Sequence, residues 1–201
     1  MLVAGIKSRP VYRGLNVDQN ATRHLFVLEG EGALALIDQA RTAGPDFLKL
    51  SDVLYVATGS KAEDHDRKIA ALGPRDLWTA PTVPVLLNRF NVMLGQAHMD
   101  TCIYIAGTEG FIGQAMQLAA NHGVDYASIH TEHRGSAARR VQCVHCKGIT
   151  ENVTTSPYTC SHCGLSLLVR DHYSRRIGAF QGVNIDAEEP GTAPRPEVLF
   201  P

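Results

Sequence analysis

Short apolar runs alternate with longer amphipathic stretches through the first two thirds of the chain. The runs are nearly continuous and rich in β-branched and aromatic residues, which is typical of strands buried on both faces of a sheet. They occupy residues 24–30, 52–59, 76–81, 101–107 and 126–132, with helical stretches at 33–44, 60–73, 83–97 and 111–123. Several of these helices end at a glycine, as in a left-handed cap. The alternation implies right-handed crossovers and predicts an α/β fold, a doubly wound parallel sheet of about five strands.

The pattern changes after "TEHRGSAARR" at residues 131–140, a polar stretch rich in glycine and alanine. Beyond it, apolar and polar residues alternate over short distances, as in a small antiparallel sheet. The stretch "KGITENVTTSPYT" has the threonine and valine content and the Ser-Pro turn signal of a hairpin. We therefore expect an α/β domain at 1–135 and a small β domain at 136–183.

The remaining residues, 184–201, hold four of the ten prolines and predict an extended strap rather than a packed element. Val198, Leu199 and Phe200 give this strap an apolar tip, which would suit a position across a partner subunit. The stretch before it alternates apolar and polar residues and carries a set that would form a basic and aromatic surface: Arg170, Arg175 and Arg176, with Asp171, His172, Tyr173 and Phe180. We interpret this set as a protein contact or a solvated face, with nucleic-acid binding as the alternative.

Composition narrows the class of protein. Apolar residues make up 44% and charged residues 19% of the 201 positions, as in ordinary globular proteins with a substantial core. The formal net charge of −1 gives no global attraction for nucleic acid or for an anionic membrane. No apolar run approaches the roughly 20 residues that span a bilayer, and residues 1–10 lack the features of an export signal. We expect a cytoplasmic protein without a membrane partner.

Four of the five cysteines stand in two C-x-x-C pairs, "CVHCKG" and "CSHCGL". In a reducing compartment, paired cysteines indicate metal or redox chemistry before structural disulfides. Cys143, Cys146, Cys160 and Cys163 have the spacing of a tetrahedral four-thiolate metal site, with a β-hairpin between the pairs closing it. The alternatives are a disulfide framework and unligated thiols. Four sulfur ligands leave no position for water, so such a site is structural, and in so small a module the metal would supply much of the folding free energy.

Zinc is the expected occupant because it needs only tetrahedral sulfur. Iron in the same cage would make a one-electron carrier and stays the alternative. His145 and His162 lie inside the two pairs and could replace a thiol, but we expect them to be exposed. Gly148 and Gly164 follow the pairs closely, where a tight turn benefits from glycine.

Glycines also cluster after the first and fourth predicted strands, in "EGEGA" and "GTEGFIG". In a doubly wound sheet a nucleotide binds at these carboxyl ends, with its phosphates at a helix N-terminus. Gly30, Gly32, Gly107 and Gly110 would form that site. Acidic residues flank the glycines, and neither turn has a Lys or Arg to offset them, which disfavours phosphate. The main interpretation is that these glycines serve tight turns; an intact dinucleotide site and a site for a ligand without phosphate are the alternatives.

We identify no catalytic constellation in the sequence. Cys102 lies inside a predicted strand and reads as a buried, small apolar residue. The histidines outside the cysteine pairs, among them His24, His65 and His130, are scattered along the chain.

The stretch from "RRVQCVHC" through "CSHCGLSLLVRDHYSRRIGAFQGVNIDAEEPG" resembles the C-terminal domain of the DmmA-type small subunit of dimethylamine monooxygenase, a haem-dependent oxidative N-demethylase family. The opening "IKSRPVY" and the α/β region resemble the N-terminal part of the same family. The resemblance implies a subunit of a heteromeric enzyme that converts dimethylamine to methylamine and formaldehyde. It places Cys143, Cys146, Cys160 and Cys163 at the family's metal positions.

The resemblance further implies that haem, flavin, an iron–sulfur centre and NAD(P)H are bound on partner chains, namely a haem-binding oxygenase subunit and a flavin and iron–sulfur reductase subunit. The α/β half also resembles the nucleotide domain of ferredoxin reductases, with "FVLEGEGALAL" at the glycine turn and "IYIAGTEGFIG" at the position of a "CGP" motif. The acidic residues and the missing cysteine and proline depart from that pattern. We expect a reductase-like scaffold, followed by a zinc ribbon, that acts as a structural or assembly subunit without catalytic residues. The alternatives are a rubredoxin-like electron carrier and a nucleic-acid-binding zinc ribbon.

Overall fold

The computed structural model describes residues 8–44, 46–59 and 64–201, which divide into two units with separate hydrophobic cores. The first unit, Tyr12–Gly135, is the α/β unit. The second, which we call the ribbon unit, comprises Ser136–Pro201 together with residues 8–11.

Five parallel strands form the sheet of the α/β unit, in the order β3-β2-β1-β4-β5. Their bounds are β1 Arg23–Glu29, β2 Ser51–Val56, β3 Asp76–Ala80, β4 Thr101–Gly107 and β5 Ile129–His133. The chain moves outward from β1 to β3 and then crosses back to β4 on the other side of β1. The carboxyl ends of β1 and β4 therefore meet at the topological switch point, where folds of this kind bind ligands.

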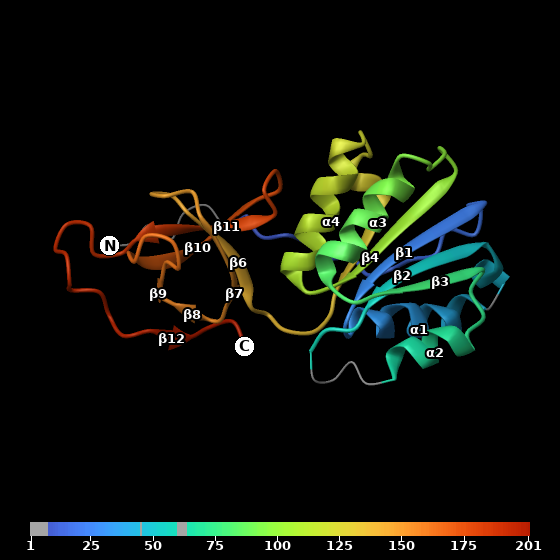
Figure 1. Cartoon of the computed structure of the whole chain (residues 1–201), viewed down its shortest axis with the longest axis horizontal. Helices are drawn as coiled ribbons and strands as arrows, with labels where there is room; N and C mark the ends of the chain where they lie inside the picture. Colours follow the sequence, from blue (N-terminus) through green and yellow to red (C-terminus); the bar gives the residue numbers. More distant parts are fainter. Residues whose placement is uncertain (1–7, 45, 60–63) are drawn as a thin grey trace. The chain divides into compact units, whose positions relative to one another are not determined.

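Four helices connect the strands: α1 Gly32–Ala43, α2 His65–Ala71, α3 Val83–Leu94 and α4 Glu109–Asn121. Short 3₁₀ turns precede β2 and β5, at Asp46–Leu50 and Tyr126–Ser128. Helices α3 and α4 cover one face of the sheet, and α1 and α2 cover the other (Figure 1). This arrangement confirms the predicted doubly wound α/β fold. Residues 60–63, at the start of the second predicted helix, and the first two residues of "IKSRPVY" lie outside the described residues.

Each face of the sheet has its own apolar layer, because alternate side chains of a strand point in opposite directions. Val27 and Ile105 point toward α3 and α4, where they meet Phe90 and Phe111. Phe26 and Tyr104 point to the other face, and their rings stack with centroids 4.5 Å apart. With both faces covered, the central strands read as continuous apolar runs, which is why the sequence located them well.

The ribbon unit contains a five-stranded sheet in the order β7-β6-β11-β10-β9. Its strands are β6 Arg139–Cys143, β7 Ile149–Val153, β9 Tyr158–Thr159, β10 Ser166–Ser174 and β11 Ala179–Asn184. All neighbours are antiparallel except β6 and β11, which run parallel in the middle of the sheet. The described N-terminal residues join this sheet, because Ser8 bridges to His172 and its N–H donates to the carbonyl of Asp171.

Residues 187–199 are mostly exposed, but the apolar tip of the predicted strap packs on the ribbon unit of the same chain. A short strand, β12 Glu197–Val198, pairs with β8 Thr155–Ser156. Phe200 is 9% exposed and belongs to the ribbon core, whereas Leu199 is 53% exposed. The guanidinium of Arg139 lies 4.0 Å from the ring centroids of both Phe180 and Phe200. The tip packs here because two aromatic faces around a buried cation form a favourable contact.

Two further details of the ribbon unit differ from the sequence interpretation. Phe180, which was assigned to an exposed aromatic surface, is 1% exposed and lies in the core. Asp171 lies between two cations, at 2.5 Å from Arg9 and 3.0 Å from Arg139, and these pairs lower the pKa of its carboxyl group despite the opposing effect of burial. Within the described part of the chain, helices long and apolar enough to cross a bilayer are absent.

Candidate metal centre and the carboxyl edge of the sheet

The four cysteines of the two C-x-x-C pairs meet in one place in the ribbon unit. Their sulfur atoms all lie within 4.8 Å of one another. Cys143 ends β6 and Cys160 follows β9, and both are buried; Cys146 and Cys163 lie in the loops and are half-buried. The Sγ atoms of Cys143 and Cys163 are 3.9 Å apart, and those of Cys146 and Cys160 are 3.8 Å apart.

These distances fit a tetrahedral thiolate site. Four Zn–S bonds of about 2.3 Å give a tetrahedron with edges of about 3.8 Å, close to the two measured separations. Apolar residues surround the sulfur atoms, including Val141, Tyr158 and Leu165. A site of this kind is closed, because all four coordination positions are filled by protein.

The two loops that carry the cysteines, which we call the knuckles, have the same hydrogen bonds. In the first knuckle, the N–H of Lys147 donates to the carbonyl of Cys143, and the N–H of Cys143 donates to Gly148. In the second, the N–H of Gly164 donates to Cys160, and the N–H of Cys160 donates to Leu165. Each knuckle therefore reverses the chain, so its flanking strands pair with each other.

This geometry corrects the predicted hairpin between the cysteine pairs. Strand β7 pairs with β6 across the first knuckle, and β9 pairs with β10 across the second. The stretch between the pairs joins two hairpins and contributes β8 to the small sheet with β12. The Ser-Pro turn signal in the sequence did not indicate that the chain reverses its direction within the two knuckles.

The two knuckle glycines have different tasks. Gly164 has φ +77°, a backbone conformation that glycine adopts easily. The equivalent residue of the first knuckle is Lys147, which has φ +63° despite its side chain. Gly148 provides space instead, because a Cβ there would lie 2.4 Å from the imidazole of His162.

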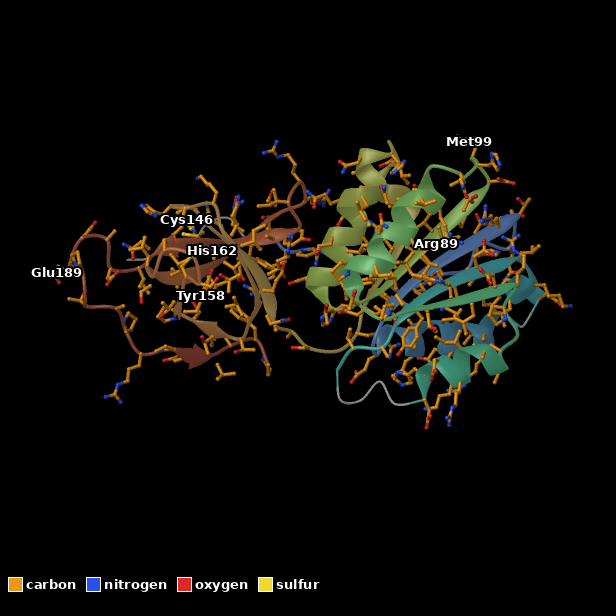
Figure 2. All side chains as sticks on the ribbon, in the orientation of Figure 1. Arg89, Met99, Cys146, Tyr158, His162 and Glu189 are labelled. Atoms are coloured by element: carbon orange, nitrogen blue, oxygen red, sulfur yellow. The ribbon has the colours of Figure 1, made fainter. Side chains whose placement is uncertain are left out.

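His145 and His162 are exposed, as expected, and Figure 2 labels His162 together with Cys146 of the cluster. The Nε2 atom of His162 lies 2.9 Å from the carbonyl oxygen of Ile149, so this ring is engaged with the backbone of the opposite knuckle. Burial raises the pKa of the Cys160 thiol, but the N–H groups of His162 and Cys163 outweigh it and lower that pKa to about 7. N–H groups that stabilise a thiolate favour metal binding, because the ligand must be deprotonated.

The glycines of the α/β unit lie at the switch point. Gly30 follows β1 and Gly32 begins α1, while Gly107 ends β4 and Gly110 lies in the first turn of α4. A Cβ on Gly32 would lie 2.1 Å from the carbonyl oxygen of Ala106, so α1 approaches β4 too closely for any side chain. Packing of α1 against β4 therefore accounts for the glycine at position 32 without any ligand.

The N-terminus of α4 binds a carboxylate of the chain itself. One oxygen of Glu29 accepts hydrogen bonds from the N–H of Thr108, at 2.9 Å, and from its hydroxyl, at 2.6 Å. Thr108 is the N-cap residue of α4, and its hydroxyl oxygen accepts from the N–H of Phe111. The positive end of the α4 dipole therefore faces Glu29, at the switch point between β1 and β4.

Other acidic groups at this edge are also engaged. The hydroxyl of Tyr12 donates to Glu109 at 3.1 Å. Glu132 accepts from the N–H of Leu15 at 3.0 Å and forms an ion pair with Arg134. The sequence singled out the acidic residues beside the glycine turns, including Glu29 and Glu109. It did not reveal the roles of Glu132, Thr108 and Tyr12, since their partners lie far away along the chain.

At the opposite edge, the structure brings together residues that look scattered in the sequence. Tyr104 is stacked on His130, with ring centroids 5.0 Å apart, and its hydroxyl oxygen lies 3.2 Å from Nδ1 of His24. The same hydroxyl accepts from the N–H of Asp18 at 3.1 Å. Cys102, expected to be buried, is half-buried, with its sulfur 3.9 Å from an oxygen of Asp18. Parallel pairing of β1, β4 and β5 places these side chains on one face.

Comparison with known proteins identifies relatives for both units. Residues 4–129 match a family described as the N-terminal domain of DmmA-like dimethylamine monooxygenase subunits, and residues 140–183 match the corresponding C-terminal domain. The chain is 31% identical over 145 residues to the heme-dependent oxidative N-demethylase delta subunit of Ectopseudomonas mendocina (strain ymp), covering 70% of this chain and 83% of that subunit.

Two solved structures are partly similar to this chain. An intact type IV self-sufficient cytochrome P450 monooxygenase is 19% identical with a TM-score of 0.44; the match covers 68% of this chain but only 19% of that one. The flavohem-like FAD/NAD binding domain of nitric oxide dioxygenase from Vibrio cholerae O1 biovar El Tor is 17% identical with a TM-score of 0.45, covering 63% and 56% of the two chains.

Proposed function

Because the chain belongs to the family of DmmA-like dimethylamine monooxygenase subunits, we propose that it is a structural subunit of a heteromeric oxidative N-demethylase. The complex would convert dimethylamine to methylamine and formaldehyde. Haem, flavin, an iron–sulfur centre and NAD(P)H would be bound by an oxygenase subunit and a reductase subunit. The role of this chain is assembly rather than catalysis. The 31% identity to a delta subunit supports membership of such a complex.

The contact between Glu29 and Thr108 is the observation that supports a role without a nucleotide. A dinucleotide bound at the switch point would place its phosphates at the turn after β1. That turn follows Glu29, whose carboxylate already accepts both donors of Thr108 on the neighbouring turn after β4. A phosphate there would meet a negative charge and lose these donors. The α/β unit thus keeps a reductase-like sheet, while the carboxylate of Glu29 occupies the switch point where a bound anion would lie.

The four-thiolate cluster supports a structural zinc ion. Cys143, Cys146, Cys160 and Cys163 would supply all ligands, and the knuckle hydrogen bonds orient the sulfur atoms toward one point. Bound zinc would supply no redox chemistry and would join the two hairpins of the ribbon unit. The surrounding core is small, so the ion would contribute a large part of the folding free energy of this unit.

Metal analysis of the full chain, purified without added metal, tests the metal proposal. We expect about one zinc ion per chain, and loss of both zinc and the ribbon fold in Cys160→Ser. Cys102→Ser is the matched control, because it removes a thiol outside the cluster and should keep the metal. Red protein with one iron per chain would instead support the electron carrier.

Reconstitution tests the assembly role. The full chain is co-expressed with the haem-binding and the flavin and iron–sulfur subunits, and the purified complex is assayed for dimethylamine-dependent NAD(P)H oxidation and formaldehyde. We expect turnover by the complex, failed assembly when this chain is omitted, and no activity of the chain alone. Oxidation of NAD(P)H or dimethylamine by the isolated chain would contradict the proposal.

A further inference from the structure

The outer face of the ribbon sheet carries a groove of about 490 Å³. Its floor includes Gln142 on β6, Gln181 on β11 and Ser174 on β10. These strands are neighbours in the sheet. Gln142 alternates with the buried Val141 and Cys143, so its side chain points away from the core and the sulfur cluster.

Charge in the groove has one sign. Lys147 and Arg176 line it together with the imidazole of His172, and none of the described lining residues is Asp or Glu. Asp171, which directly precedes the lining residue His172, is paired with Arg9 and Arg139. The groove therefore attracts an anionic partner, although the whole chain has a net charge of −1.

The remaining chemistry of the groove favours a peptide over a nucleic acid. Gln142 and Gln181 are register partners on adjacent strands, so two side-chain amides stand next to each other on the floor. Gln142 donates one N–H to the carbonyl of Lys147 at 3.4 Å, and the oxygen of Gln181 accepts from Arg170 at 3.5 Å. The oxygen of Gln142 and the NH₂ group of Gln181 still offer an acceptor and donors to a peptide backbone. Nucleic-acid grooves combine cations with several aromatic side chains on which bases stack, whereas the described lining residues include no Phe, Tyr or Trp and offer only the single imidazole of His172.

We propose that this groove binds an acidic peptide segment of a partner subunit, with Lys147 and Arg176 contacting its carboxylates and the two glutamines its backbone. The identity of the partner as a demethylase subunit rests on the proposed function; the preference for an acidic peptide does not. Because Val144 and Lys147 belong to the first knuckle, one wall of the groove is part of the metal centre. The N–H of Val144 donates to Gly182 at 3.0 Å, which fixes this wall to β11.

Binding of a fluorescein-labelled oligoglutamate peptide to the full chain tests the groove directly. Fluorescence anisotropy at low ionic strength should show binding that weakens with salt, since the contacts are electrostatic. The double variant Lys147→Gln/Arg176→Gln should bind about tenfold more weakly, as expected for two exposed charge contacts. In NMR spectra, the peptide should shift the side-chain amide signals of Gln142 and Gln181.

Arg175→Gln is the matched control, because Arg175 is adjacent to Arg176 but does not line the groove. It should change the affinity by less than about twofold. An equal loss of affinity in Arg175→Gln and Arg176→Gln would overturn the proposal, since general surface charge would then explain binding. Absence of peptide binding, or tighter binding of an oligothymidylate in the same groove, would also overturn it.

Removal of the metal gives a second readout. A chelator that removes the metal ion from the four cysteines should abolish peptide binding by the wild-type chain, because the first knuckle would no longer hold one wall of the groove in place. Unchanged binding would contradict the placement of the groove beside the metal centre.

An assembly experiment distinguishes failure of this inference from failure of the proposed function. If the double variant assembles with the demethylase subunits as well as the wild type does, the groove is not their docking site, and the subunit role still stands. If the peptide binds in the groove but no demethylase subunit assembles, the subunit role fails alone.

Discussion

Glu29 lies at the end of β1, and its carboxylate meets the N-terminus of α4, where the N–H and the hydroxyl of Thr108 reach the same oxygen. The sequence showed that acidic residues flank the glycine turns and that this departs from a phosphate site. It did not show which carboxylate reaches the helix, because Thr108 is 79 positions away. The glycines also became explicable only in three dimensions, when the approach of α1 to β4 was known.

Replacing Glu29 by Gln should destabilise the α/β unit by about 1 kcal/mol. The amide oxygen can still accept a hydrogen bond, but the charge facing the helix dipole is lost, together with the charge-assisted part of the bond. Urea unfolding followed by the fluorescence of Trp78, the single tryptophan, measures the change in this unit. Glu188→Gln, an equal charge change on an exposed residue, should have almost no effect. Equal stability of the two variants would contradict the assigned contact.

Two kinds of element differ in how well the sequence located them. The central strands β1 and β4 were located to within one residue, since burial on both faces makes them continuous apolar runs, whereas the run expected for β2 extended three residues beyond Val56. In the ribbon, the ligand positions follow from cysteine spacing, but the strand pairing does not. Strands β6 and β11 are parallel neighbours although about 40 residues separate them along the chain. Their pairing, with Gln142 opposite Gln181, is visible only in the structure.

At the scale of these elements, Phe200→Ala should destabilise the ribbon unit by about 2–4 kcal/mol. The ring fills part of the core and covers the guanidinium of Arg139, so its loss leaves a cavity and exposes a buried cation. Hydrogen exchange of peptides from residues 139–184, measured by mass spectrometry, should become faster. Leu199→Ala is the control, because Leu199 is more than half exposed and should change exchange little. Unchanged protection in Phe200→Ala would refute the packing of the tail.

Across the whole molecule, the alternation of strands and helices predicted the fold class of the α/β unit. The change of pattern near residue 135 coincides with the place where the chain passes from the α/β unit to the ribbon unit. What escaped prediction were long-range associations: residues 8–11 joining the ribbon unit, the tail packing on its core, and the cluster around Tyr104. Each depends on contacts between distant segments that no local pattern encodes.

The stability of the α/β unit should fall as the pH falls below about 6.5. The pKa values of His24 and His130 are lowered, mainly because burial disfavours the imidazolium, with Asp18 acting in the opposite direction. In this range the unfolded chain binds more protons than the folded chain, so acidification favours unfolding. This stabilisation is complete above the unfolded pKa of 6.5 and is lost as the pH falls toward the folded values.

Urea unfolding at about pH 8 and about pH 5.5, followed by Trp78, measures this dependence without interference from the ribbon, which has no tryptophan. The loss should be at most about 1.4 kcal/mol per pH unit for each histidine. His130→Gln should reduce the dependence on pH. A midpoint that rises on acidification would show that these histidines are not buried in their neutral form.

The parallel pairing of β6 with β11 also sets the order in which the ribbon unit can be built during synthesis. Translation delivers all four thiols by residue 163, yet the second neighbour of β6 arrives only with residues 180–182. A nascent chain that has captured its metal early therefore still presents one open side of β6, and the ribosome must add β11 before the sheet closes. Metal capture and sheet closure are thus separated by about 20 residues of synthesis, an interval in which that open edge can pair wrongly.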